Sequence, residues 1–404
     1  MPRPLVPTAL ALALLLAAAP PAAGEVCALD DAPGATLLLP WFEVDLFEPD
    51  GVTTLFSIVN AVPEAHVVRV TVWSDLAVPV LWFDVALTGW DVQTINLRDV
   101  VAGTLPSTGG ANSPGGDFSE DGPFPGCDTI LPYPPLTAGE VAELRAALTG
   151  EPGPISAQCA GRAYGDGVAR GYVTVDVVAG CSAAPVDEAY FGPGGELAFD
   201  NVLIGDFFVV DPSRDAAWGE GLVRLEADPE GFAPGDRTFY QTWTGGTASD
   251  AREPLPTVWA SRFLLGGGFD GGSELVAWRD LGTPGERFAC ASPPRAPNMS
   301  EIVIFDEMEA VVFVDDCVIL CVPAGLARLT AATQRVEIGG GELPTPFPFG
   351  LFVLDFKPFA ADAAPLQAWL GLVASAEGRY NVGLDASPLD PPCAPTPEVT
   401  PGFP

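Results

Sequence analysis

A two-residue alternation of apolar and polar side chains constrains the fold of this chain more than any other feature. Val173, Val175 and Val177 alternate with Thr174 and Asp176, as in a strand with one buried and one solvated face. β-branched residues, which suit a pleated sheet, fill many such segments. The pattern predicts strands at 35–46, 52–60, 67–75, 80–98, 168–180, 197–210, 221–227, 237–244, 257–265, 273–279, 301–314, 349–356, 366–375 and 379–386. Many short strands between Gly- and Pro-rich turns predict a mostly β chain of β-sandwich modules.

One short helix interrupts this strand-rich pattern. Thr137 and Glu140 have the spacing of a capping box, in which each side chain bonds the other residue's backbone N–H. An apolar stripe follows from Val141 to Leu148, and Gly150 is placed to end the helix. The sequence therefore predicts a helix between Thr137 and Gly150.

Composition divides the chain into five parts. Residues 101–135 are dense in Gly, Pro, Ser and Asp and have no period, and a connection that long is a linker or a functional loop. We expect a signal peptide at 1–24, an N-terminal immunoglobulin-like β module at 25–100, a Gly/Pro-rich loop and helix at 101–150, a C-terminal β-rich region at 151–393 and a disordered tail at 394–404.

The N-terminus has the order of a signal peptide. Arg3 precedes an apolar stretch at 9–19, and the small residues Ala22, Ala23 and Gly24 follow. The apolar stretch is about eleven residues, whereas a membrane span needs about twenty. We expect cleavage, export and a mature protein in the periplasm or outside the cell, without a membrane span.

Acidic residues outnumber basic ones by 53 to 18, for a formal net charge of −35, and Lys357 is the only lysine. Such a surface repels phosphate backbones and anionic headgroups, which excludes nucleic acid as a partner. The acids either keep an exported protein soluble or partly surround cations such as Ca²⁺.

Eight cysteines in an exported chain predict disulfides. They are Cys27, Cys127, Cys159, Cys181, Cys290, Cys317, Cys321 and Cys393. If Cys317 and Cys321 share one strand, their Cα atoms are roughly 13 Å apart, beyond the limit of about 7 Å for a disulfide. Each would then need another partner, unless a turn lies between them.

Residues 52–98 resemble an immunoglobulin-like sandwich of bacterial surface proteins. The resemblance rests on the runs 54–60, 68–73, 83–87 and 94–97, and on the turn Leu87-Thr88-Gly89 before the last of them. It covers about a sixth of the chain. The chain as a whole also resembles uncharacterised secreted proteins of bacteria. These resemblances imply a fold but no activity.

The single histidine argues against His-based hydrolysis. His66 lies in a polar gap between two strands, and nothing near it has the spacing of a catalytic triad or a zinc site. Paired carboxylates, which suffice for glycoside cleavage, remain possible. Asp306, Glu307 and Glu309 follow an apolar run at an expected strand end, although a solvated turn explains them equally well.

Two binding features remain. The loop residues Asp117, Glu120 and Asp121 could supply part of a calcium site, although Ca²⁺ requires six to eight oxygens.

Trp73 and Trp82 fall opposite the apolar face of their strands, so they either form an exposed strip that stacks on sugars or pack beneath a second layer.

These observations predict a non-catalytic secreted or cell-surface β-sandwich protein that is structural, adhesive or ligand-binding, with an extracellular protein or glycan as a possible partner. The alternative is a secreted carbohydrate-active hydrolase that uses paired carboxylates. A calcium-stabilised module is a variant of the first hypothesis.

Overall fold

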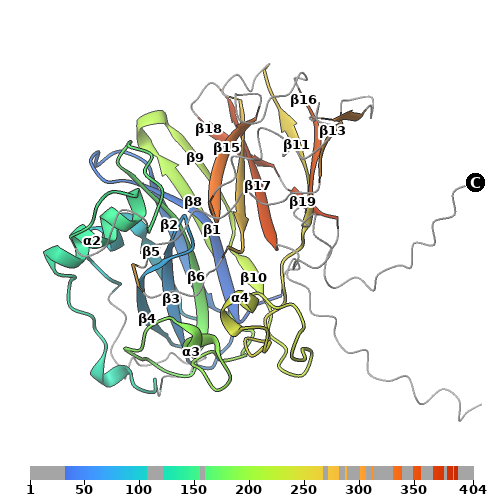
Figure 1. Cartoon of the computed structure of the whole chain (residues 1–404). Coiled ribbons are helices and arrows are strands. Elements are labelled where there is room, and N and C mark those ends of the chain that lie inside the picture. Colours follow the sequence, from blue (N-terminus) through green and yellow to red (C-terminus); the bar gives the residue numbers. More distant parts are fainter. Residues whose placement is uncertain are drawn as a thin grey trace, which may run out of the picture.

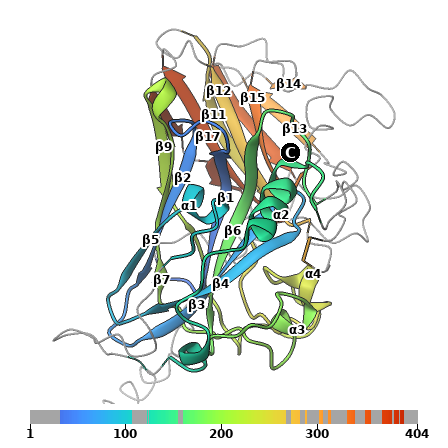
Figure 2. The ribbon, with the colours of Figure 1, turned by 90° about the vertical axis from the view of Figure 1, so that its left-hand side faces the viewer.

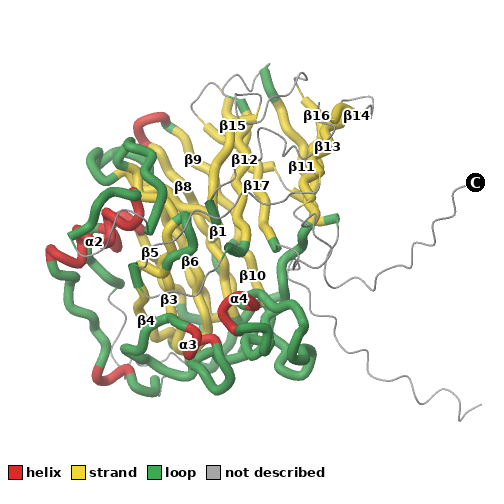
Figure 3. Tube along the Cα trace, viewed as in Figure 1, coloured by secondary structure: helices red, strands yellow, loops and turns green. Residues whose placement is uncertain are grey.

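The chain is mostly β, as the alternation predicts, and its strands form four antiparallel sheets (Figures 1 and 3). The computed structural model describes residues 32–106, 122, 124–154, 160–266, 272–281, 287–288, 301–305, 311–313, 331–338, 349–355, 367–376, 380–384 and 386–389. The predicted signal peptide at 1–24 and the predicted disordered tail at 394–404 lie outside these residues.

Two sheets come from the first part of the described chain. The first has the order β10-β1-β6-β3-β4, from β10 (Val223–Leu225), β1 (Thr36–Asp45), β6 (Val168–Val178), β3 (His66–Ser74) and β4 (Pro79–Leu87). The second has the order β5-β2-β8-β9, from β5 (Val92–Asn96), β2 (Thr53–Asn60), β8 (Asp206–Asp211) and β9 (Ala216–Gly221), with β7 (Leu203–Ile204) also paired to β2. Figure 2 shows these two layers, and buried residues from both join one hydrophobic core.

The other two sheets come from the C-terminal half. One has the order β15-β12-β17-β18, from β15 (Thr333–Ile338), β12 (Ser273–Arg279), β17 (Ala368–Ala376) and β18 (Tyr380–Leu384). The other has the order β14-β13-β16-β11-β19, from β14 (Val311–Phe313), β13 (Glu301–Phe305), β16 (Phe349–Asp355), β11 (Val258–Leu264) and β19 (Ala386–Pro388). Strands β1 and β12 lie side by side, so the two pairs of sheets are in contact.

Strands from both sides of the segment 101–150 pair within the same sheets. In the first sheet, β6 lies between β1 and β3. In the second, β8 pairs with β2. These pairings join residues that are 97 or more positions apart in the sequence, which a local sequence pattern does not specify.

The predicted helix is confirmed as α2 (Ala138–Thr149). The Thr137 side chain accepts a hydrogen bond from the backbone N–H of Glu140, and the Glu140 carboxylate accepts from that of Thr137. Gly150 ends the helix in the left-handed conformation, where a residue without a Cβ is unstrained. The buried residues Leu144 and Leu148 lie on the face that α2 packs against the body of the protein.

Three further helices have only four or five residues. They are α1 (Leu97–Val101), α3 (Glu188–Phe191) and α4 (Gln241–Thr244). Among the described helices, none has both the length and the apolar character needed to cross a bilayer. Two single-turn 3₁₀ helices, η1 (Cys127–Thr129) and η2 (Pro212–Arg214), complete the helical elements of the described ranges.

The predicted strand at 237–244 is wrong. Its apolar residues belong instead to turns and α4, and Phe239, Tyr240 and Trp243 are buried. A short apolar run fits a buried strand and a buried helical turn equally well, and here packing decides. The range 80–98 contains two strands, β4 and β5, and the turn between them, at 88–91, includes Thr88 and Gly89, where the sequence also predicts a turn. Strands β9 and β15 were not predicted, because their charged residues obscure the alternation.

Cys127 and Cys181 form a disulfide, with Cα atoms 4.8 Å apart and a sequence separation of 54. These are the only cysteines among the described residues. The bond joins the segment before α2 to the end of β6. The expectation that Cys317 and Cys321 do not pair with each other falls on residues outside the described part.

Candidate functional site

A polar cleft of about 490 Å³ lies where β1 and β6 of the first sheet meet β12 and β15 of the third. Its lining contains Trp41, Glu43, Arg162, Tyr164, Arg170, Arg214, Glu274, Gln334, Arg335 and Glu337. Four of the seventeen arginines of this acidic chain therefore line one cleft. Positive charge is concentrated here in a protein that is otherwise strongly negative.

A β-bulge brings β1 to the cleft. The pairing of β1 with β6 shifts between Leu39 and Phe42, around Pro40, which has no N–H to give to the ladder. The carbonyl of Pro40 accepts a hydrogen bond from the Thr333 hydroxyl at 2.5 Å, which ties β1 to β15. Trp41 follows the bulge and lines the cleft, as expected where a bulge redirects side chains.

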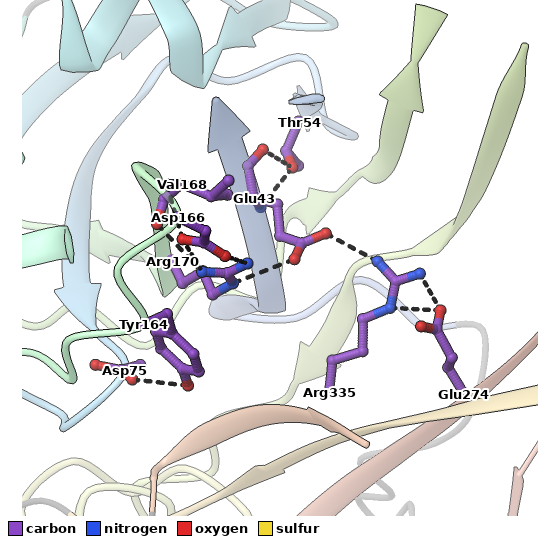
Figure 4. A network of polar contacts seen from close by, with 9 residues as sticks. All are labelled: Glu43, Thr54, Asp75, Tyr164, Asp166, Val168, Arg170, Glu274 and Arg335. Atoms are coloured by element: carbon purple, nitrogen blue, oxygen red, sulfur yellow. Dashed lines mark hydrogen bonds and ion pairs between the residues drawn. The ribbon is translucent and has the colours of Figure 1, made fainter. Parts of the chain in front are cut away.

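Glu43 is the centre of a charge network that crosses the cleft (Figure 4). Its Oε1 accepts from Nε of Arg170, the directly opposite residue on β6, at 3.3 Å. Its Oε2 accepts from Nη1 of Arg335 on β15 at 2.9 Å. Arg335 also donates to Glu274 on β12, with Nε 2.6 Å from Oε2. The network pairs both oxygens of the Glu43 carboxylate with guanidinium groups. These ion pairs offset the free-energy cost of removing the charged carboxylate from water.

Tyr164 lies between two guanidinium groups. The ring centroid is 5.0 Å from Cζ of Arg162 and 4.5 Å from Cζ of Arg170, within the range of cation–π attraction. The Tyr164 hydroxyl donates to Oδ2 of Asp75 at 3.2 Å (Figure 4). Burial and the neighbouring charge of Asp75 raise the pKa of Tyr164, so the ring stays neutral and its hydroxyl remains a donor.

Asp75 lies behind the cleft in the turn between β3 and β4. Its carboxylate accepts from the backbone N–H of Arg162 at 3.0 Å, and its carbonyl accepts from the N–H of Ala332 at 2.7 Å. Only 1 % of Asp75 is exposed. Burial raises the pKa of Asp75 to about 6, against the opposing effects of Arg162, Tyr164 and Arg170.

We expect Asp75→Asn to stabilise the protein more at pH 7.5 than at pH 4.5. Because the folded-state pKa of Asp75 is above its unfolded value, its contribution to stability is present in acid and is lost as the pH rises through about 6. The difference from the ordinary pKa of 3.8 corresponds to about 3 kcal/mol in total, of which about 2 kcal/mol falls between pH 4.5 and pH 7.5. Urea unfolding of both proteins at both pH values measures this change. A stability difference that does not change with pH would contradict the prediction.

Two glutamates face each other across strands at the edge of the cleft. Glu274 on β12 is directly opposite Glu337 on β15, and such neighbours have Cβ atoms about 5 Å apart. Arg335 neutralises Glu274, whereas the Glu337 carboxylate makes no hydrogen bond or ion pair with the described part of the chain. Like charges directly opposite are unfavourable, so this pair does not serve stability and is a candidate for function.

The residues proposed from sequence fall elsewhere. Asp117, Glu120 and Asp121, and also Asp306, Glu307 and Glu309, lie outside the described residues, so the calcium and strand-end hypotheses stay predictions. Within the described ranges, no group of three His, Cys, Asp or Glu residues could hold a metal ion. His66 begins β3, and its Nδ1 is 3.1 Å from the carbonyl oxygen of Glu64.

The two tryptophans opposite the apolar face pack under other groups. Trp73 is 1 % exposed and belongs to an aromatic cluster with Tyr172 and Trp243. Trp82 is half-buried, with the guanidinium of Arg287 5.1 Å from its ring. Packing beneath a further layer is the correct interpretation for Trp73, whereas Trp82 is only partly covered, which is compatible with either interpretation.

Sequence reasoning missed the cleft. The one available signal was that basic residues are few in this acidic chain. Each buried arginine is therefore a candidate for a specific role. That signal does not reveal which arginines converge, since Arg335 and Glu43 are 292 positions apart.

Comparisons with protein-family models, with curated proteins and with solved structures found no match for this chain.

Proposed function

We propose that this chain is an exported, non-catalytic β-sandwich protein, with an immunoglobulin-like N-terminal module, that binds a polar ligand in the cleft between its sheet pairs. The cleft carries the proposal, because about 490 Å³ is the size of a small-molecule site. Its polar and charged groups can recognise hydroxyl groups and charge, and Tyr164 adds exposed ring surface. A saccharide is the ligand class that needs both hydrogen-bonding groups for its hydroxyls and an aromatic ring against its apolar face.

The hydrogen bonds within the cleft favour binding over catalysis. Glu43 and Glu274 both accept hydrogen bonds from Arg335, so these carboxylates already have partners within the protein and are not free to act on a substrate. The signal-peptide features at 1–24 support export to a compartment where glycans are available.

A secreted carbohydrate-active hydrolase remains the second candidate. The observation in its favour is the Glu274–Glu337 pair, since retaining glycosidases hold two carboxyl groups about 5 Å apart. In that case Glu274, neutralised by Arg335, would be the nucleophile and Glu337 the acid/base.

The two candidates differ in turnover. We expect neutral and acidic oligosaccharides to shift the indole N–H resonance of Trp41, assigned with Trp41→Phe, without releasing new reducing ends. The indole of the exposed Trp90 is the internal control. Reducing-end release that both Glu274→Gln and Glu337→Gln abolish would establish the hydrolase and overturn the proposal. A Trp41 resonance that no saccharide shifts would contradict both candidates.

A further inference from the structure

Arg162 differs from the other arginines of the cleft. Arg170 pairs with Glu43 and Asp166, Arg335 with Glu43 and Glu274, and Arg214 with Asp211. Within the described ranges, the Arg162 guanidinium pairs with no carboxylate. Its single side-chain hydrogen bond runs from Nη1 to Oε1 of the neutral Gln334, at 2.9 Å.

The free edge of Arg162 is preorganised. Nε and Nη2 make no hydrogen bond to the described residues, and these two donors form a planar fork that fits the two oxygens of a carboxylate. The Tyr164 ring lies 5.0 Å from Cζ and limits the orientation of the guanidinium. The backbone of Arg162 is held by the buried carboxylate of Asp75. Little conformational entropy is therefore lost when an anion binds.

A second cation adds to the positive potential. Burial, and then the charge of Arg162, lower the pKa of the buried Arg279. An anion at Arg162 would relieve this repulsion between the two guanidinium groups.

We propose that the ligand of the cleft is an acidic saccharide whose uronic carboxylate binds bidentately to Nε and Nη2 of Arg162. This inference rests on the proposed binding function and specifies its ligand class. A singly charged carboxylate fits better than a phosphate dianion, because Glu43, Glu274 and Glu337 line the same cleft. Those carboxylates also provide acceptors for sugar hydroxyls, and Glu337 has no competing partner in the described part.

Glucuronate and glucose make a matched pair of probes, since they differ only in the oxidation of C6. We expect glucuronate to bind at least about tenfold more tightly than glucose, by titration of the Trp41 indole resonance. Arg162→Gln should reduce this ratio to near one. Arg162→Lys, which keeps the charge but not the planar fork, should retain part of it and serves if Arg162→Gln does not fold.

The control is Arg262→Gln, which removes the same charge from an exposed position on β11 outside the cleft. It should leave the ratio unchanged. Equal binding of glucose and glucuronate would overturn the inference and leave the binding function intact. Acetate binding as tightly as glucuronate would overturn the saccharide assignment. If neither sugar, as monomer or oligosaccharide, shifts Trp41, both the inference and the proposed function are wrong.

Discussion

Arg69→Met should lower the free energy of unfolding by about 3–5 kcal/mol, because it leaves a carboxylate buried without its counter-charge. Arg69 on β3 and Asp84 on β4 are directly opposite, and both side chains are fully buried. Nε of Arg69 donates to Oδ1 of Asp84 at 2.8 Å, and Nη2 to Oδ2 at 3.2 Å. The guanidinium also donates to Oε2 of Glu196 at 2.6 Å and to the carbonyl of Ser182 at 2.7 Å.

Urea unfolding followed by tryptophan fluorescence measures this loss. Arg262→Met, at an exposed site, is the matched control and should change stability by less than about 0.5 kcal/mol. Adding Asp84→Leu to Arg69→Met should recover part of the loss, because the unpaired charge is then gone. A loss below about 1 kcal/mol for Arg69→Met would show that water reaches Asp84.

Trp73→Ala should cost about 3–5 kcal/mol, the usual range for a buried tryptophan replaced by alanine. The Trp73 ring is stacked on Tyr172 at 5.7 Å between centroids and meets the edge of Trp243 at 5.4 Å. Its Nε1 donates to the Thr174 hydroxyl at 2.9 Å. The substitution removes both ring contacts and leaves a buried hydroxyl without its donor.

Trp90→Ala provides the comparison, because 54 % of Trp90 is exposed. It should cost less than about 1 kcal/mol. Trp73→Phe should fall between the two, since it keeps a ring but loses the hydrogen bond to Thr174. Equal losses for Trp73→Ala and Trp90→Ala in the same unfolding experiment would mean that the aromatic cluster does not stabilise the fold.

Little of the candidate site could be predicted from the sequence. Glu43 lies in a predicted strand, Arg162 in a loop and Arg335 in a strand that the pattern does not predict, and no motif joins them. Their convergence depends on a bulge at Pro40 and on the contact between β1 and β15. The acids that did stand out, such as Asp117, attracted attention because they are close in sequence, which is not a requirement for closeness in space.

The sequence by itself determined the strand-rich class, most strand positions and the capped helix from Thr137 to Gly150. These features depend on residues within a few positions of one another, through side-chain period and capping geometry. Only the tertiary structure decided that β6 lies between β1 and β3, that 237–244 is not a strand and that four arginines share one cleft. Such outcomes depend on the packing of surfaces from distant segments. The predicted solvated face of β6 is also wrong, because Thr174 and Asp176 are buried beneath other segments, and a local pattern does not specify what covers a strand.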